Sequence, residues 1–195
     1  MNKKLKNASK QSTVLFLGDN IYPKGLPKKE DETRAFAEHQ LNVQTDAVKD
    51  FKGEAIFIPG NHDWYSDGLK GLKRQEKYVE DILGKNTFLP ENGCPIEKVD
   101  VTDDIVLIIV DTEWYITNWD KHPTINDDCE IKTRAKFFEE LEGLISLCHK
   151  GLVDIAAVGN EVIHTERTAD VPTADVMKNG PGDQPLRTIA QPRIA

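Results

Sequence analysis

The stretch "STVLFLGDNIYPKGLP", residues 12–27, passes from contiguous apolar residues directly into polar and turn-forming ones. Residues 14–17 predict a short strand buried on both faces, because turn formers follow the apolar run at once. Asp19 would then lie at the carboxyl end of a buried strand, and in open α/β sheets ligands usually bind in the crevice beyond such ends. A plain turn explains Gly-Asp-Asn equally well. A second stretch is needed to decide between them.

The stretch "EAIFIPGNHDWY", residues 54–65, repeats this pattern, with an apolar strand at 55–58 followed by a turn and then polar and aromatic residues. If the two strands are neighbours in one sheet, four side chains meet at a single crevice: Asp19, Tyr22, Asn61 and His62. A carboxylate can bridge two cations, an amide oxygen can complete a hard coordination sphere, and a phenolate binds trivalent metals well. The paired stretches therefore predict a metal site.

The rest of the chain alternates between helical and strand patterns. Amphipathic helices are expected at 28–49, 69–83 and about 130–148, and further strands at 105–110 and, less strongly patterned, 153–158. The third helix is expected to bury Phe138 and to begin near the N-caps Asn126, Asp127 and Asp128. Ile82 is expected on the buried face of the helix at 69–83. Alternating strands and helices indicate the α/β class.

Composition limits the class of protein. A chain of 195 residues fits one domain. The formal net charge of −8 argues against a nucleic-acid partner, which would need a basic patch. No apolar run approaches the roughly 18 residues of a membrane helix, and residues 1–12 are polar, without a signal-peptide pattern. The localisation stays undecided, and an exported parent protein is compatible with the sequence.

The three cysteines, Cys94, Cys129 and Cys148, show no C-x-x-C spacing, so neither a zinc ribbon nor a disulfide framework is indicated. They are interpreted as ordinary thiols. The alternative is a bridge between Cys94 and Cys129 if the parent protein is exported.

Composition changes toward the carboxyl end, where no aromatic residue follows Phe138 and four of the ten prolines lie beyond residue 171. A segment without large apolar groups does not offset its ordering entropy. The expected organisation is a polar segment at 1–12, a domain at 13–148 and a divergent tail at 149–195, disordered from about 171.

The blocks "GDNIY", residues 18–22, and "GNHD", residues 60–63, resemble in order and strand context the calcineurin-like metallophosphoesterases. "GDNIY" is similar to the G-D-x-x-Y variant of purple acid phosphatases. The resemblance implies that Asp19 is a bridging ligand, that Asn61 binds the second metal and that Tyr22 binds ferric iron. It also implies that His62 is the catalytic imidazole.

The same resemblance implies the front part of a sandwich of mixed β-sheets flanked by helices. It implies two metal ions, iron with iron, manganese or zinc, and a phosphate-ester substrate. Asp63 is expected to fix the tautomer of His62 from just outside the metal ligands, or else to cap the next segment.

The sequence departs from the family pattern in two places. Asp19 is its first acidic residue, so the upstream D-x-H or D-x-G block is absent, and His149 and His164 are single where the family has G-H-x-H. Three ligands cannot hold two cations roughly 3.5 to 4 Å apart. The expectation is therefore an incomplete, inactive phosphoesterase. The alternative is a non-catalytic module that binds a phospho-ligand or a protein.

The aromatic segment "DTEWYITNWDKHP", residues 111–123, either lines a substrate pocket through Trp114, Tyr115 and Trp119 or simply packs in the core. His39 and His122 are assigned to the surface.

Overall fold

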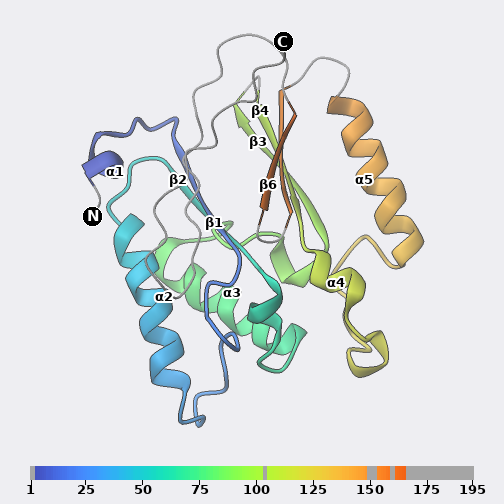
Figure 1. Ribbon diagram of the computed structural model, residues 1–195, viewed down its shortest axis with the longest axis horizontal. Helices are drawn as coiled ribbons and strands as arrows, with labels where there is room; N and C mark the ends of the chain where they lie inside the picture. Colours follow the sequence, from blue (N-terminus) through green and yellow to red (C-terminus); the bar gives the residue numbers. More distant parts are fainter. Residues whose placement is uncertain (1–2, 103–104, 149–152, 159–160, 166–195) are drawn as a thin grey trace, which may run out of the picture.

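The computed structural model describes residues 3–102, 105–148, 153–158 and 161–165 (Figure 1). The amino-terminal part contains α1 (Lys3–Asn7), β1 (Thr13–Leu17), α2 (Arg34–Val48), β2 (Glu54–Ile58), η1 (Asn61–Trp64) and α3 (Leu69–Leu83). The carboxyl-terminal part contains η2 (Glu91–Gly93), β3 (Ile96–Thr102), β4 (Ile105–Val110), α4 (Thr112–Ile116), η3 (Trp119–Lys121), α5 (Arg134–Cys148), β5 (Val153–Val158) and β6 (Glu161–Thr165). The tail expected to be disordered from about 171 lies outside the described residues.

The strands form two sheets. β1 and β2 pair in parallel, while the second sheet has the order β3-β4-β5-β6, in which only β4 and β5 run parallel. Figure 1 shows α2 and α3 beside the first sheet and α5 beside the second. This mixed α/β arrangement confirms the predicted class and is consistent with a partial metallophosphoesterase fold.

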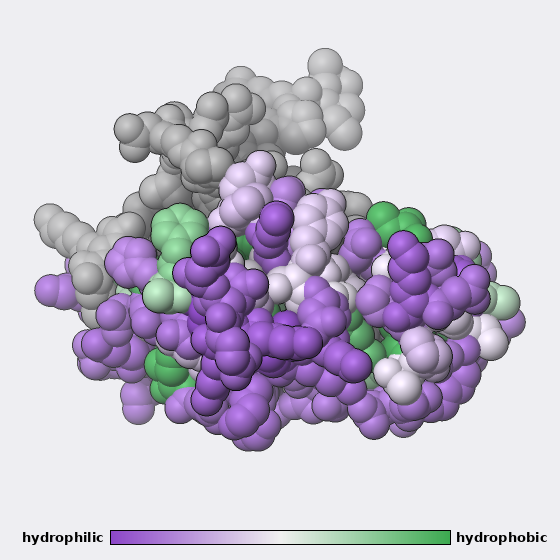
Figure 2. All heavy atoms as spheres, turned by 90° about the horizontal axis from the view of Figure 1, so that it is seen from below, coloured by the Kyte–Doolittle hydropathy of each residue, from purple (hydrophilic) through white to green (hydrophobic). Residues whose placement is uncertain are grey.

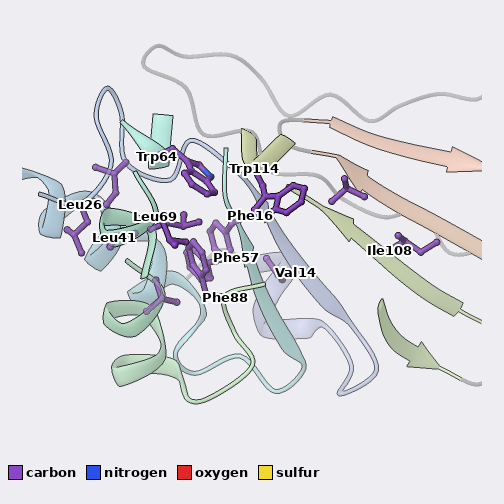
Figure 3. Close-up of a cluster of buried hydrophobic side chains, with 14 of the residues drawn as sticks. Val14, Phe16, Leu26, Leu41, Phe57, Trp64, Leu69, Phe88, Ile108 and Trp114 are labelled. Atoms are coloured by element: carbon purple, nitrogen blue, oxygen red, sulfur yellow. The ribbon is translucent and has the colours of Figure 1, made fainter. Parts of the chain in front are cut away.

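The side chains of the central strands divide between two hydrophobic clusters with the period of two that a strand imposes. Leu17, Ile56 and Ile58 share the smaller cluster with Leu107 and Ile109, which joins the two sheets. The alternate residues of the same strands belong to the larger cluster, with side chains of the helices. Figure 3 shows part of that cluster, in which the Phe16 and Phe57 rings stack 4.1 Å apart. Both faces of β1, β2 and β4 are therefore buried, as their contiguous apolar residues predict.

α3 has the predicted bounds, but Ile82 is 44% exposed and does not join the core. α5 begins at Arg134 rather than near 130, because Thr133 Oγ1 accepts a hydrogen bond from the Lys136 amide and caps it. Its buried ring is Phe137, at 4% exposed, and Phe138 is 47% exposed. Adjacent residues on a helix differ by about 100° in direction, so burying the first exposes the second.

The strand β3 was not predicted. Its sequence "IEKVDVT" alternates apolar and polar residues, and it pairs antiparallel with β4. Strand β5, in contrast, occupies the predicted residues, and β6 extends the sheet beyond them.

A disulfide joins Cys94 and Cys129 across 35 residues, so the interpretation of these two cysteines as ordinary thiols was wrong. The fold brings the end of η2 beside the loop before α5, where Lys73 of α3 also pairs with Asp128. The bridge thus fixes the loop at 117–131 to the body of the domain.

The face shown in Figure 2 is covered mainly by hydrophilic side chains, with a few small hydrophobic areas. This surface agrees with a chain of which 30% is charged. Among the described helices, none is both long and apolar enough to span a bilayer.

Candidate metal-binding and phosphoesterase site

The two polar segments leave the same edge of the first sheet. β1 and β2 are parallel and in register up to Leu17 and Ile58, so both chains emerge side by side. Gly18 and Asp19 turn the chain with φ values of 76° and 51°, a left-handed conformation that glycine and aspartate tolerate. Asp19 Oδ1 then accepts a hydrogen bond from the His62 amide at 3.1 Å. The structure therefore places Asp19 directly against the "GNHD" segment.

His62 lies half-buried in a frame of backbone and aromatic groups. Its Nδ1 is 2.7 Å from the Pro23 carbonyl oxygen. A carbonyl only accepts hydrogen bonds, so Nδ1 carries the proton and Nε2 is the nitrogen left for a ligand. The ring centroid lies 4.4 Å from that of Tyr22 and 4.8 Å from that of Tyr65. His62 is thus held between two tyrosine rings with one defined tautomer.

Asp63 has a different place from the one expected beside the imidazole. Its carboxylate is fully buried and accepts hydrogen bonds from the amides of Gly60, Asn20 and Ile21 at 2.8 to 3.3 Å. The side-chain amides of Asn20 and Gln75 donate to it as well. The expected contact with His62 is made by Pro23 instead, whereas the alternative, that Asp63 caps a segment, matches its bond to Gly60 at the start of η1.

The Asp63 carboxylate ties the two motif segments together. Two of its donors belong to residues 20–21 after β1, and a third belongs to Gly60 after β2. Burial raises its pKa to about 6, against the lowering effect of these hydrogen bonds. Its role in the structure is to fix the distance between the segments that carry Asp19 and His62.

Helix α2 supports the first segment from the other side. Gln40 accepts from the Tyr22 amide at 2.9 Å and donates to the Tyr22 carbonyl at 2.8 Å. Gln44, one turn further, donates to the Asn20 carbonyl at 2.7 Å. The backbone of "GDNIY" is therefore hydrogen-bonded to a helix as well as to the neighbouring loop.

A second buried carboxylate lies behind the site. Asp111, at the end of β4, accepts from the Trp64 indole at 2.9 Å and from the Glu113 amide at 3.0 Å. Burial raises its pKa to about 7. Trp114 is fully buried, and its ring packs on Trp119 and Phe137, so Trp114 belongs to the core, while Tyr115 and Trp119 are half-buried beside it. Asp111 and Trp64 thus anchor η1 to the second sheet.

Two further histidines whose side chains the structure describes, His39 and His122, differ in exposure. His39 is exposed, as predicted. His122 is half-buried and meets the Trp64 ring edge-on at 6.4 Å, so it is only partly exposed. Gly68 allows the His122 ring to pack this closely, because a Cβ on Gly68 would lie 2.1 Å from that ring.

Three side chains from the two segments at the edge of the first sheet carry oxygen atoms of the kinds that hard cations bind. Asp19 supplies a carboxylate, Asn61 an amide and Tyr22 a phenol, which is 40% exposed. Within the described ranges, no three His, Cys, Asp or Glu side chains gather closely enough to hold a metal. A second cation would need ligands that the described residues do not provide.

Sequence reasoning missed three groups that shape this site: the Pro23 carbonyl, Tyr65 and the glutamines of α2. The spacing of Gln40 and Gln44 was a usable signal, because residues four apart share one face of a helix. Tyr65 also follows Asn61 by four residues. Nothing local in the sequence indicates the Pro23 carbonyl.

Comparison with known proteins agrees with this geometry. The family model described as calcineurin-like phosphoesterase matches residues 1–177. Neither a curated protein nor a solved structure matches the chain. With two ordered motifs at neighbouring strand ends and a family match over most of its length, the chain belongs to the calcineurin-like phosphoesterase family.

Proposed function

We propose that Asp19 and Asn61 bind a hard metal cation, with Tyr22 as a third ligand, and that His62 acts on a phosphate ester at the same edge. The family is in general one of metal-dependent phosphoesterases, which supports this class of function. The observation that best supports the proposal is the hydrogen bond from the backbone amide of His62 to Asp19 Oδ1, because it joins the candidate metal carboxylate to the residue that carries the candidate catalytic imidazole.

The residues of this chain have distinct tasks in that proposal. Bound metal would supply positive charge to the phosphoryl oxygens and acidify a water molecule. His62 keeps Nδ1 on the Pro23 carbonyl, so that Nε2, when protonated, donates to the leaving oxygen. Tyr22 and Tyr65 hold the imidazole plane in place by contact. Asp63 acts through the loops and touches no reacting atom.

The ligand set suggests low activity for the 195-residue chain alone. A binuclear centre clamps the attacking and leaving oxygens between two cations, and the described residues offer ligands for one. We expect turnover of p-nitrophenyl phosphate at or near background with added iron, manganese or zinc. We expect weak binding of Mn²⁺, measured by electron paramagnetic resonance of the free ion, and loss of that binding in Asp19→Ala.

The matched control is Asp46→Ala, since Asp46 is an exposed aspartate of α2 that pairs with Lys49 of the same helix region. It should leave Mn²⁺ binding unchanged. Equal binding by both variants would contradict the metal site. Metal-dependent turnover that Asp19→Ala abolishes would show instead that the missing ligands are supplied, for example by a second chain.

The likeness to purple acid phosphatases is a finer proposal that rests on Tyr22. Ferric iron bound to its phenolate should give a tyrosinate charge-transfer band, which should disappear in Tyr22→Phe and persist in Tyr78→Phe. A band that survives Tyr22→Phe removes this refinement and leaves the family assignment in place.

A second candidate function is a non-catalytic module that binds a phospho-ligand. The observation in its favour is the incomplete ligand set among the described residues. Binding of inorganic phosphate that does not depend on Mn²⁺ or Asp19, without turnover, would support it over the phosphoesterase.

A further inference from the structure

Tyr65 is an exposed aromatic residue, so packing in the hydrophobic core does not account for a tyrosine at this position. Tyr65 is 54% exposed. It follows directly after the short helix η1 (Asn61–Trp64). An exposed aromatic residue gains little from burial. Its contacts are nevertheless specific, because they involve Asn61, the proposed metal ligand, and His62, the proposed catalytic residue.

The first contact concerns the amide of Asn61. Asn61 Nδ2 donates to Tyr65 Oη at 2.6 Å. An asparagine amide has a donor end and an acceptor end, and only the oxygen can ligate a cation. Since the donor end is fixed on the tyrosine, the amide is held in one orientation. No described residue makes a hydrogen bond to Asn61 Oδ1, which leaves this oxygen for a ligand.

The second contact concerns the imidazole of His62. The Tyr65 ring centroid lies 4.8 Å from that of His62, on a ring that Tyr22 also contacts. One tyrosine side chain therefore touches a candidate metal ligand through its hydroxyl and the candidate catalytic group through its ring. The two contacts use different atoms, so they can be removed separately.

We infer that Tyr65 is a positioning residue that orients the Asn61 amide oxygen toward a cation and steadies the His62 ring. This inference rests on the proposed function, because it assigns Asn61 to the metal. Partners that orient a metal ligand typically change metal affinity by 10- to 100-fold when they are removed. For a half-exposed site we expect the lower end of that range.

The test uses Tyr65→Phe, which removes only the hydroxyl, in the full 195-residue chain. Without metal, ¹⁵N relaxation of the Asn61 side-chain amide should show an ordered group in the wild type and a mobile one in the variant. Mn²⁺ affinity, measured by electron paramagnetic resonance of the free ion, should fall by about tenfold. Unchanged amide order, or unchanged Mn²⁺ affinity, would overturn the inference.

Tyr78→Phe is the matched control, since Tyr78 of α3 donates to the Asn42 side chain at 2.9 Å away from this site. It should change neither readout. Tyr65→Leu should additionally shift the His62 ring protons, which Tyr65→Phe leaves in place. If Mn²⁺ binding by the wild type does not depend on Asp19, the proposed function fails, whereas the metal-free amide order still decides whether Tyr65 positions Asn61.

Discussion

Replacing Asp63 with alanine is expected to lower the free energy of unfolding by about 3 to 5 kcal/mol. The carboxylate is fully buried and is the acceptor for five N–H groups. Truncation removes this acceptor from all five donors, of which the Asn20 side-chain amide also donates to the Ile58 carbonyl, and it removes the link between the segments after β1 and β2. Urea denaturation of the wild type and the variant at pH 7 measures the difference.

Asp63→Asn sharpens this test. The amide keeps the size of the side chain but turns one acceptor oxygen into a donor that faces N–H groups. We therefore expect a substantial loss here too, smaller than that of alanine. Asp46→Ala is the surface control and should cost less than about 1 kcal/mol. A loss in Asp63→Ala no larger than in the control would show that the carboxylate does not hold the loops.

The loss should also depend on pH. Burial raises the pKa of Asp63 to about 6 from an ordinary 3.8, so the folded protein binds a proton in a range where the unfolded chain has released it. The stability that this group contributes is therefore fully present below about 4 and decreases as the pH rises to about 6. The difference between the wild type and Asp63→Ala should shrink over the same range.

Loss of the Cys94–Cys129 bridge is the second large effect. A disulfide that closes 35 residues restricts the unfolded chain, which corresponds to about 3 to 4 kcal/mol of stability. The double variant Cys94→Ser/Cys129→Ser should show this loss in urea denaturation. Its segment at 117–131 should also be cleaved sooner in limited proteolysis, because the bridge fixes that loop beside η2.

Reducing agent provides the internal control. The wild type should fall to the stability of the double variant when it is reduced, while the double variant should not respond. Cys148→Ser leaves the bridge intact and should retain the reductant-sensitive part of the stability. If oxidised and reduced wild type unfold at the same urea concentration, the bridge does not stabilise the fold.

Local sequence patterns predicted those strands and turns whose formation depends mainly on residues adjacent in the chain. Contiguous apolar residues followed by turn formers placed β1, β2 and β4, and motif order placed Asp19 beside His62. The strand β3 escaped prediction because Glu97, Lys98 and Asp100 give it a polar edge-strand pattern. In α5, either Phe137 or Phe138 could face the core, depending on how the helix is rotated about its axis, and only tertiary packing selects Phe137.

Long-range contacts explain the other differences. Cys94 and Cys129 are brought together by the packing of η2 against the loop before α5, which no spacing in the sequence reveals. Asp63 looks like part of a ligand motif, yet the donors that fix its carboxylate include residues about 40 positions earlier. The chemistry of a residue in such a motif is therefore decided by which backbone the fold places around it.

The glutamine pair on α2 has a thermodynamic consequence for ligand binding. Gln40 satisfies both the N–H and the carbonyl of Tyr22, as a neighbouring strand would. Fixing the backbone of one residue costs about 1 to 2 kcal/mol of conformational entropy. In this domain the segment from Asn20 to Tyr22 loses that entropy during folding. A ligand that arrives later meets a loop already in place, and more of its contact energy remains as affinity.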